Sequence, residues 1–421
     1  MACADEPVAW PLSSAVVTAL GECDPGEAEP VAGDLVDHFA VIADPRQGRW
    51  VVHPVAAVLA LCAAAVVAGM RSFTAIAGWV ADVPVADLAG LYARCGSAVQ
   101  VRAPSKATLW RVVTGVDAAQ ADAAIGAWLL SRKAVDDIAA DADADADTDA
   151  GGGGADGEAG ITDTDVVAVD GKTLRGARDD EGNQPHLLAA MTHTGLVVGQ
   201  VEVGAKTNEI PMLSTLLDTL DIAGRVITAD ALHTQRETAD YLHRRGANFF
   251  FCVKENQPKL FAALDALPWQ DTPIACERTE RGHGRLERRT IRVLPAPEDL
   301  PFPHVRQATL IERYVSDLHQ HHQSAVAVLG ITSLPTDRGT PIRLAALARS
   351  HWGIESLHWL RDTLYREDES HTRTRSGPRV MAALRNPAIG AIRLLGRTDI
   401  TETTRWASRV MQRPFEILGL H

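Results

Sequence analysis

Two aspartates stand directly after short runs of β-branched residues, in the segments VVAVDGK and VITADALH. They are Asp170 and Asp230. Side chains at the ends of strands in an α/β sheet point into the crevice where ligands bind. Two carboxylates brought together there repel each other unless cations join them, and oxygen ligands of this kind suit Mg²⁺ or Mn²⁺. The pattern therefore predicts a divalent-metal site at one edge of a sheet.

A third carboxylate would complete such a site, and Glu355 in the helical segment HWGIESLHWLRD is the best candidate. Two ions roughly 3.5–4 Å apart can activate an attacking oxygen and stabilise the leaving one when a phosphodiester is displaced. The spacing alone leaves open that the two aspartates are helix caps or turn residues. A nucleotide-binding loop is excluded, because it would need a glycine five residues before Gly171, where the sequence has Val166.

Basic and amide side chains gather in four places, and we predict that they contact a phosphate backbone. Two places adjoin strand ends, and a third is the arginine-rich segment RGHGRLERR. The fourth is the stretch 371–397, which holds six arginines and no acid, as is typical of a surface for phosphates. The alternative for each is an ordinary solvated side chain. The candidates are Lys172, Lys254, Asn256, His283, Arg285, Arg288, Arg379 and Arg385.

The elements that must position these residues begin at residue 166. Short apolar runs predict strands at 166–169, 186–192, 196–203, 225–228 and 248–253. Helices are expected after Asn208 and at 234–245. A three-strand meander followed by helix-separated strands predicts a mixed sheet with helices on its faces. Strand-like runs between about 276 and 334 predict a β-rich insertion, and helices resume near residue 342.

The first 165 residues differ from the rest. After a tail at 1–34, residues 35–135 have the apolar spacing of helices. The apolar run 55–70 is shorter than the roughly 20 residues that span a bilayer, which favours a buried helix and no membrane segment. Residues 136–165 hold eleven acids, no Lys or Arg and four consecutive glycines. This composition predicts a flexible, extended acidic linker.

The net charge of −13 does not exclude a nucleic-acid partner, because the acidity is concentrated in that linker. Residues 166–421 carry 32 basic and 30 acidic side chains, and local patches set nucleic-acid affinity. Six cysteines without a CxxC pair predict reduced thiols rather than a disulfide framework or a zinc module. The acidic N-terminus lacks the basic start of a signal peptide. We therefore expect a cytoplasmic location.

Five segments, in order, resemble the blocks of bacterial insertion-sequence transposases, in the branch that includes the H-repeat-associated proteins. They are VVAVDGKTLRGA, HLLAAMTHTGLVVGQVEVGAKTNEIPMLSTLLDTLDIAGRVITADALHTQ, FFFCVKENQPKL, RGHGRLERR and HWGIESLHWLRDTLYREDES. The segments HFAVIADPRQGRW, AGMRSFTAIAGWV and PSKATLWRVV resemble the helical domain that accompanies this branch. The resemblance runs from about residue 37 to 397 and is broken mainly by the acidic linker.

This resemblance implies an α/β fold in which a ribonuclease-H-like mixed-sheet catalytic core occupies 166–400, with a β-rich insertion at about 270–335. A transposase-associated helical domain at 35–135 would precede it, and a C-terminal tail at 401–421 would follow. Asp170, Asp230 and Glu355 would be the catalytic residues and would bind two Mg²⁺ or Mn²⁺ ions. The wider class often has an Arg four residues before the Glu and a Lys seven after it. Here those positions are His351 and Asp362, so their DNA-contacting roles are not carried over.

The predicted function is a DDE transposase that cuts phosphodiester bonds at element ends and joins the freed 3′-hydroxyl to target DNA. Its partner would be double-stranded DNA, and the class implies a dimer in the synaptic complex. No motif places a Ser or Tyr for a covalent protein–DNA intermediate. Two alternatives stay open, a domesticated nuclease and a non-catalytic DNA-binding descendant, although the presence of all three carboxylates speaks against the second.

Overall fold

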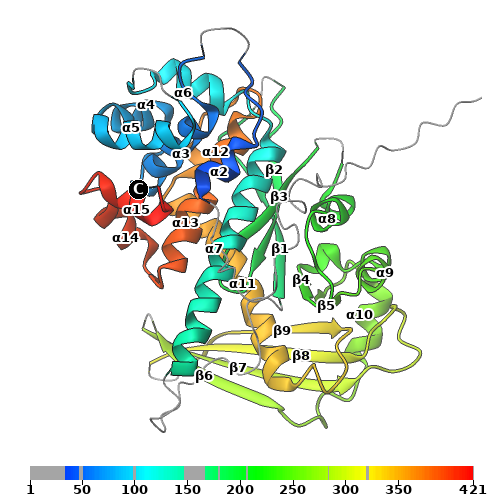
Figure 1. Ribbon diagram of the computed structural model, residues 1–421. Helices are drawn as coiled ribbons and strands as arrows, with labels where there is room; N and C mark the ends of the chain where they lie inside the picture. The colour runs from blue at the N-terminus through cyan, green and yellow to red at the C-terminus, as the bar shows by residue number, and fades with distance from the viewer. Residues whose placement is uncertain are drawn as a thin grey trace, which may run out of the picture.

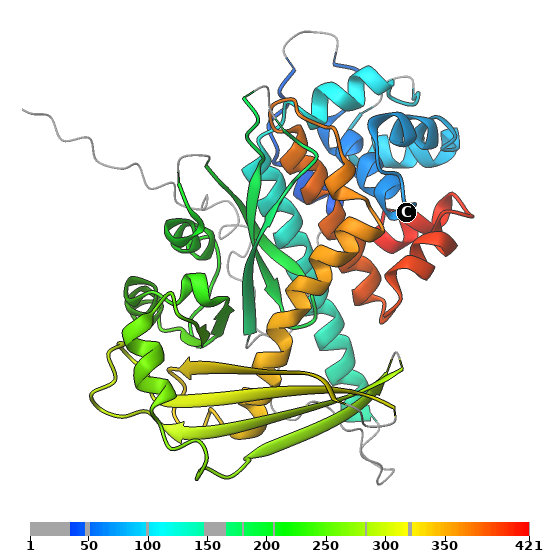
Figure 2. The same cartoon turned by 180° about the vertical axis from the view of Figure 1, so that it is seen from behind.

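The computed structural model describes residues 34–46, 51–97, 101–146, 166–178, 181–204, 207–282, 284–318 and 322–420. A helical region lies at one end, and a mixed sheet with its covering helices extends away from it (Figure 1). Seen from behind, helix α11 (Pro341–Thr363) crosses the molecule from the outer part of the sheet towards the helical region (Figure 2). This helix carries one of the three predicted carboxylates.

Five strands form the inner part of the sheet: β1 (Val166–Thr173), β2 (His186–Thr192), β3 (Val197–Val203), β4 (Val226–Ala229) and β5 (Asn248–Val253). Their order is β3-β2-β1-β4-β5. The first three strands are antiparallel neighbours, whereas β1, β4 and β5 run parallel. The parallel strands are almost wholly buried, as expected where helices cover both faces. This confirms the predicted ribonuclease-H-like mixed-sheet core.

The predicted β-rich insertion is also confirmed. It consists of β6 (Cys276–Gly282), β7 (Arg285–Pro295), β8 (Gln307–Asp317) and β9 (His322–Thr332), joined as antiparallel neighbours. Strand β9 pairs with β5, so the insertion extends the core sheet to nine strands.

Helices α8 (Glu209–Leu217), α9 (Arg236–Arg244) and α10 (Pro258–Asp265) connect the later core strands and the insertion. Helix α11 begins where the Thr340 side chain accepts a hydrogen bond from the Arg343 amide, with a proline in its first turn. Its apolar residues recur at helical spacing and face the sheet, which leaves the opposite face to solvent. The buried ones include Leu344, Leu347, Ile354 and Leu357.

The N-terminal helices are α2 (Leu35–Ala40), α3 (Val55–Val67), α4 (Phe73–Ala81), α5 (Val85–Arg94), α6 (Lys106–Val113) and α7 (Ala118–Ala146). Every residue of α3 is buried, so this alanine-rich helix is the centre of the helical region, as its composition predicts. In the described ranges no single helix is long and apolar enough to cross a membrane. Only α4 and α5 taken together reach that length, and they are bent by 105°.

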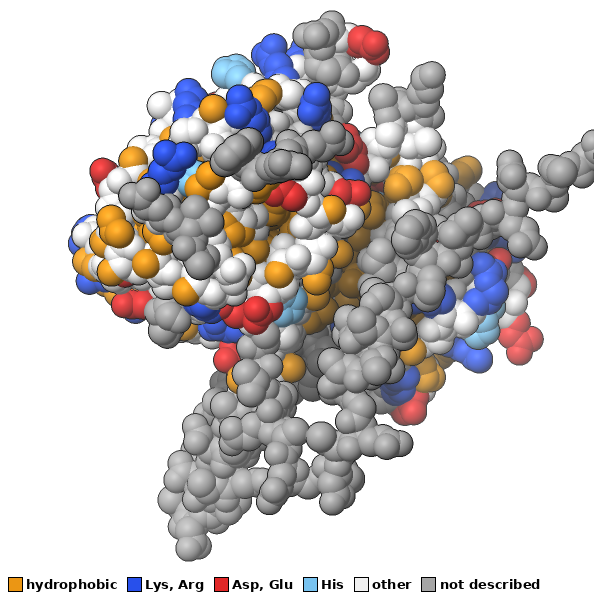
Figure 3. Space-filling view, turned by 45° about the horizontal axis from the view of Figure 1, so that its top comes forward, with side chains coloured by type: hydrophobic (Ala, Val, Ile, Leu, Met, Phe, Trp, Pro, Cys, Tyr) orange, Lys and Arg blue, Asp and Glu red, His pale blue; other side chains and the backbone are white. Residues whose placement is uncertain are grey.

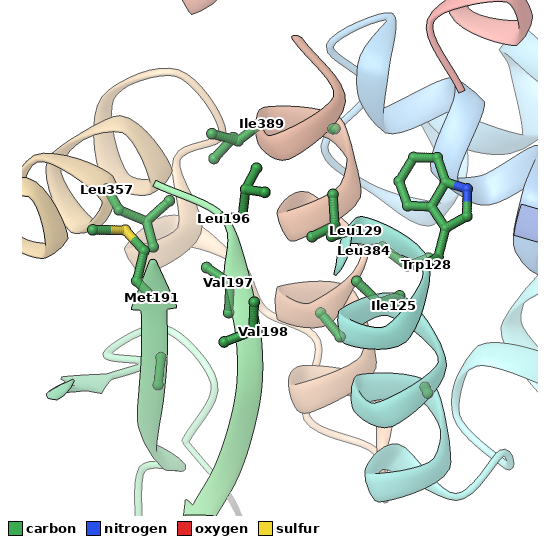
Figure 4. Packing of buried hydrophobic residues seen from close by; sticks show 14 of the residues in the cluster. Ile125, Trp128, Leu129, Met191, Leu196, Val197, Val198, Leu357, Leu384 and Ile389 are labelled. Carbon is green, nitrogen blue, oxygen red and sulfur yellow. The ribbon is translucent and has the colours of Figure 1, made fainter. Parts of the chain in front are cut away.

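Helix α7 joins the helical region to the sheet. Figure 4 shows Ile125 and Leu129 of α7 turned towards Val197 and Val198 of β3. The two elements approach so closely at Gly126 that a Cβ there would overlap the Val198 carbonyl. A glycine at this position therefore permits the contact.

The structure differs from two expected boundaries. Helix α7 continues to Ala146, so residues 136–146 are helical rather than extended. Alanine is the best helix former, and an existing helix removes the cost of nucleation. The rest of the predicted linker, 147–165, lies outside the described residues. The expected C-terminal tail is also helical and consists of α14 (Ile400–Ala407) and α15 (Gln412–Leu418). Helix α15 packs on α3, and its Phe415 is stacked on Trp79 of α4.

Candidate active site

The first two predicted carboxylates lie side by side on neighbouring strands. Val169 of β1 is the Cα partner of Ala229 of β4 in a parallel ladder. Asp170 and Asp230 are the next residues along the two strands and therefore stand at the same level, where the parallel pairing of β1 with β4 ends. Asp230 directly follows β4, whereas Asp170 lies inside β1, because the strand predicted at 166–169 continues to Thr173 in its pairing with β2. This is the edge of a parallel sheet at which ligands bind.

The cap interpretation left open for Asp230 also holds. One oxygen of Asp230 accepts a hydrogen bond of 3.0 Å from the Leu232 amide and so caps the short helix η2 (Ala231–His233). A carboxylate has two oxygens and about four acceptor directions, so capping does not exhaust it. The hydrogen bond fixes the orientation of the carboxylate at the strand end.

The third carboxylate, Glu355, is exposed on α11, which packs across β1 and β4. One turn earlier, His351 is half-buried, and its Nδ1 lies 3.3 Å from the Thr228 hydroxyl of β4. Burial lowers the pKa of His351, while the charges of Asp170, Glu355 and Asp230 each act to raise it. All three carboxylates thus lie close enough to influence one imidazole, and the fold brings together residues that are 60 to 185 positions apart.

A second histidine of α11 contacts the site. His358 Nδ1 lies 3.4 Å from Asp170 Oδ2, and its Nε2 is buried without a hydrogen-bond partner among the described residues. Both histidines therefore pack α11 against the strand ends that carry the aspartates. Neither was singled out for this role from sequence.

A network of side-chain hydrogen bonds links the segment of Asp170 to the segment of Asp230. The sequence did not reveal this network. Glu209, in the first turn of α8, contacts His186 Nε2 at 2.6 Å and His233 Nε2 at 3.2 Å. His186 Nδ1 in turn lies 2.7 Å from the Thr173 hydroxyl of β1. The hydrogen bonds from the two imidazoles are the main cause that lowers the pKa of Glu209 to about 2. The carboxylate is therefore charged and links β1 to the turn after Asp230.

The donors fit a divalent metal in kind, because carboxylate oxygens are what Mg²⁺ and Mn²⁺ prefer. Within the described ranges, however, no three His, Cys, Asp or Glu side chains are close enough together to hold an ion as they stand. The three carboxylates share a neighbourhood without forming a closed cage. Mg²⁺ commonly keeps several waters and shares its ligands with substrate phosphates, so a closed protein cage is not required.

Lys172, which was predicted to contact a phosphate, is held by acidic side chains of the protein itself. Its side chain is 8% exposed, and its ammonium contacts the two Asp362 oxygens at 2.8 and 2.7 Å. Asp362 stands where the wider class often has a Lys, seven residues after Glu355. A second acid, Asp368, lies 3.5 Å away. The lysine is held by internal acids in this structure, because Asp362 and β1 meet only once α11 packs on the sheet.

Arg379 and Arg385 were predicted to bind DNA, and their positions contradict that prediction. Arg379 pairs with buried Asp122 of α7 at 2.7 Å and donates to the Gln200 carbonyl. Arg385 is buried and pairs with buried Glu367 at 2.6 Å. Two of the six arginines in the stretch 371–397 therefore have their counter-charges in other parts of the chain.

Two predicted residues line a hollow of about 1170 Å³ next to Asp230. Lys254 and Asn256 lie on its wall, together with apolar side chains of α10 and β9. Asn256 donates a hydrogen bond of 2.6 Å to the Ala231 carbonyl, so it holds the turn that follows Asp230. The observed contact gives this asparagine a structural role at the site.

A second hollow, of about 450 Å³, is lined by Glu355, Arg285, Arg313 and the exposed Trp359. Arg285 thus lines the same hollow as Glu355, and its contact with DNA stays a prediction. Arg288 is exposed on β7, but Glu277 binds it through two hydrogen bonds of 2.7 and 2.8 Å. His283 lies outside the described residues.

This chain belongs to the DDE transposase family. The model of the family described as "Transposase DDE domain" matches residues 161–389, and one described as "DDE_Tnp_1-associated" matches residues 36–129. Similar curated proteins include "Putative protein YbfL" of Escherichia coli (strain K12), 26% identical over 372 residues that cover 85% of this chain and 90% of that protein. The "H repeat-associated putative transposase YhhI" of the same strain is 25% identical over 375 residues, with coverage of 85% and 90%.

Among solved structures, the chain is similar to the protein in "Cryo-EM structure of piggyBac transposase synaptic complex with hairpin DNA (SNHP)". The identity is 10% and the TM-score 0.38, over 91% of this chain and 78% of that one. The family membership rests on the sequence matches, which span the sheet, the insertion strands and α11.

Proposed function

We propose that this protein is a metal-dependent DNA transposase that cleaves phosphodiester bonds at the ends of an insertion sequence and transfers the 3′-hydroxyl to target DNA. The observation that carries the proposal is the convergence of Asp170, Asp230 and Glu355 around His351. Family membership supports the class of chemistry. The individual steps, the duplex DNA substrate and a dimeric synaptic complex are inferences from that class.

In this proposal Asp170, Asp230 and Glu355 hold two Mg²⁺ or Mn²⁺ ions. Such ions would activate the attacking oxygen, first of water and then of the 3′-hydroxyl, and stabilise the leaving oxygen. The chain itself orients the carboxylates. The Leu232 amide fixes Asp230, and His358 contacts Asp170. Burial lowers the pKa of His351, which favours the neutral imidazole. This side chain of α11 contacts Thr228 of β4.

The two hollows beside the carboxylates support a nucleic-acid substrate. Lys254 lines the same hollow as Asp230, and Arg285 lines the same hollow as Glu355, so each hollow pairs a carboxylate with a cation. Guanidinium and ammonium groups bind phosphate oxygens through charged hydrogen bonds. A DNA strand bound at the carboxylates would have these two side chains available to its phosphates.

The test is cleavage of a labelled duplex that carries the element's own end, with Mg²⁺, Mn²⁺ or EDTA. Asp230→Asn is the informative variant, because Asn caps helices as well as Asp does and keeps the fold while removing the charge. Asp299→Asn is the matched control, since Asp299 is exposed on the loop between β7 and β8. We expect metal-dependent nicking at the element boundary by the wild type and the control, and none by Asp230→Asn.

The alternative outcomes are also defined. Binding of the duplex without cleavage in every variant would support the non-catalytic DNA-binding alternative. Cleavage by Asp230→Asn at the wild-type rate would show that the active site lies elsewhere in the protein. Cleavage without strand transfer to a second duplex would favour a domesticated nuclease.

A further inference from the structure

A hollow of about 520 Å³ in the helical region has a lining rich in arginine. It is formed by the segment before α3, the start and body of α6, and the residue Arg375 that precedes α12 (Gly377–Ala383). Its four arginines are Arg46, Arg102, Arg111 and Arg375. We call this feature the arginine hollow.

The charge of the arginine hollow is largely uncompensated. Asp44 pairs with Arg46 at 2.7 Å, but Arg102, Arg111 and Arg375 have no ion pair among the described residues. Like charges held together repel each other, so such a group is most stable when an anion binds.

Neighbouring groups respond to this positive potential. His53, which also lines the hollow, has its pKa lowered first by burial and then by the charges of Arg102 and Arg46. A neutral His53 adds no further charge, and its ring contacts the Tyr92 hydroxyl. The arginines, rather than the histidine, therefore define the charge of the hollow.

The backbone at Arg375 is held in an uncommon conformation. Its φ of 47° lies in the left-handed region, which costs energy for a residue with a side chain. Packing of the following helix fixes this conformation, because Gly377 meets Thr114 of the α6 segment so closely that a Cβ would come within 3.0 Å. The fold thus places the guanidinium of Arg375 beside the three arginines that the helical region contributes to the hollow.

The arginine hollow is distinct from the candidate active site. Helix α6 lies at the end of the molecule opposite the insertion strands (Figure 1). Figure 3 brings this end forward and shows Lys and Arg side chains on the surface of the helical region. The exposed Trp110 also lines the hollow and offers an aromatic face beside the cations.

We propose that the arginine hollow binds phosphates of the duplex DNA and forms a second DNA contact, separate from the one at the carboxylates. This proposal rests on the proposed function for the identity of its ligand. Guanidinium groups bind phosphate oxygens bidentately, and three free ones around one hollow suit consecutive phosphates better than a single small anion. The contact is sequence-independent, since it reads the backbone alone.

The test uses the full-length chain and a labelled duplex, with the dissociation constant measured over a range of salt concentrations. The variant Arg102→Ala/Arg111→Ala removes two exposed guanidiniums that make no hydrogen bond in the described structure. The control Arg244→Ala/Arg409→Ala makes the same charge change at two exposed arginines outside the hollow. Each lost phosphate contact reduces the slope of log K against log salt by about 0.9.

We therefore expect the slope of the hollow variant to fall by about 2, and that of the control to stay at the wild-type value. Equal melting temperatures of the three proteins establish that the fold is intact. An unchanged slope in the hollow variant overturns the proposal. If the hollow variant has an unchanged DNA slope but binds inorganic phosphate or poly-glutamate more weakly than the wild type, the hollow serves a small anion or an acidic protein instead of DNA.

This outcome is separable from that of the proposed function. Both proposals are supported if the hollow variant has the reduced salt slope and still cleaves DNA in a metal-dependent reaction at low salt. Absence of cleavage in the wild type, with a slope that still depends on Arg102 and Arg111, would remove the catalytic proposal and leave the DNA contact. Retained cleavage with an unchanged slope would do the reverse.

Discussion

The carboxylate of Glu367 is buried between two guanidiniums, and its removal should destabilise the protein strongly. Arg361 Nη2 and Arg385 Nη1 approach its Oε1 at 2.9 and 2.6 Å, and all three side chains are at most 3% exposed. Burial is the largest single effect and raises the pKa of Glu367, but the two guanidiniums outweigh it and leave the pKa at about 2. Folding therefore stabilises the ionised carboxylate of Glu367 relative to its protonated form.

The magnitude follows from the difference between that value and the ordinary 4.5 of a glutamate. At about 1.4 kcal/mol per pKa unit, ionised Glu367 contributes roughly 3 kcal/mol to the free energy of unfolding at pH 7. Because the folded pKa is depressed, this contribution is present above pH 4.5 and is lost as the pH falls towards 2. At pH 3.5 about 2 kcal/mol should remain.

Glu367→Gln tests this reasoning, because it keeps the size of the side chain and leaves two buried guanidiniums without a carboxylate. We expect the free energy of unfolding in urea to fall by about 3–5 kcal/mol at pH 7. Arg385→Met should cost less, about 1–2 kcal/mol, since Arg361 still neutralises Glu367 and Met fills part of the space. The loss in Glu367→Gln should shrink by about 1 kcal/mol between pH 7 and pH 3.5.

Two results would refute this account of the cluster. One is a loss below about 1 kcal/mol for Glu367→Gln at pH 7, the range of an exposed ion pair. The other is a greater loss for Arg385→Met than for Glu367→Gln. A DNA-binding salt slope that falls in Arg385→Met, with stability unchanged, would restore the original prediction that Arg385 contacts DNA.

Three further variants test the support of the candidate active site. Glu209→Gln should lower the cleavage rate about 10–100-fold and raise the Mn²⁺ concentration needed for the half-maximal rate, because a supporting hydrogen-bond partner is lost. Glu202→Gln is the control at an exposed glutamate, and equal effects of the two variants would contradict this role of Glu209. Gly171→Ala would place a Cβ 2.5 Å from Glu209 Oε1. We expect a loss of about 1–3 kcal/mol in urea unfolding, and no loss would mean that Glu209 can move away freely. Asn256→Ala removes the hydrogen bond to the turn after Asp230, so cleavage should slow while the salt dependence of DNA binding stays unchanged; a lower slope would instead make Asn256 a DNA contact.

Much of the core could be predicted from sequence because its signals are local. A β-branched run followed at once by an acid places Asp230 directly after a strand without knowledge of the partner strand. The same signal identified the strand that carries Asp170, but not its continuation to Thr173, which depends on pairing with β2. The alternation of helical and strand periodicity likewise fixes the order of the elements. The resemblance then implied Glu355 as the third carboxylate, and α11 carries it to the same neighbourhood.

The helical continuations at 136–146 and at the C-terminus were harder to predict. The first is an alanine-rich extension of a helix that is already formed, in a segment whose charge suggested an extended chain. The second depends on partners, because the apolar face of α15 is buried against α3 of the N-terminal region and against α13 (Arg385–Leu394). A short amphipathic segment is marginal by itself, and tertiary packing decides whether it folds.

What the sequence determined by itself was the type of chemistry and the chain order of the residues that carry it. What only the tertiary structure decided was which charges remain available. Arg379 and Asp122 are 257 residues apart, yet they form one ion pair, whereas Arg102 and Arg375 converge on one hollow with no acid between them. Electrostatic energy depends on distance in space and on burial, and neither can be read from separation along the chain. An acid-free stretch of sequence is therefore no guide to a free basic surface.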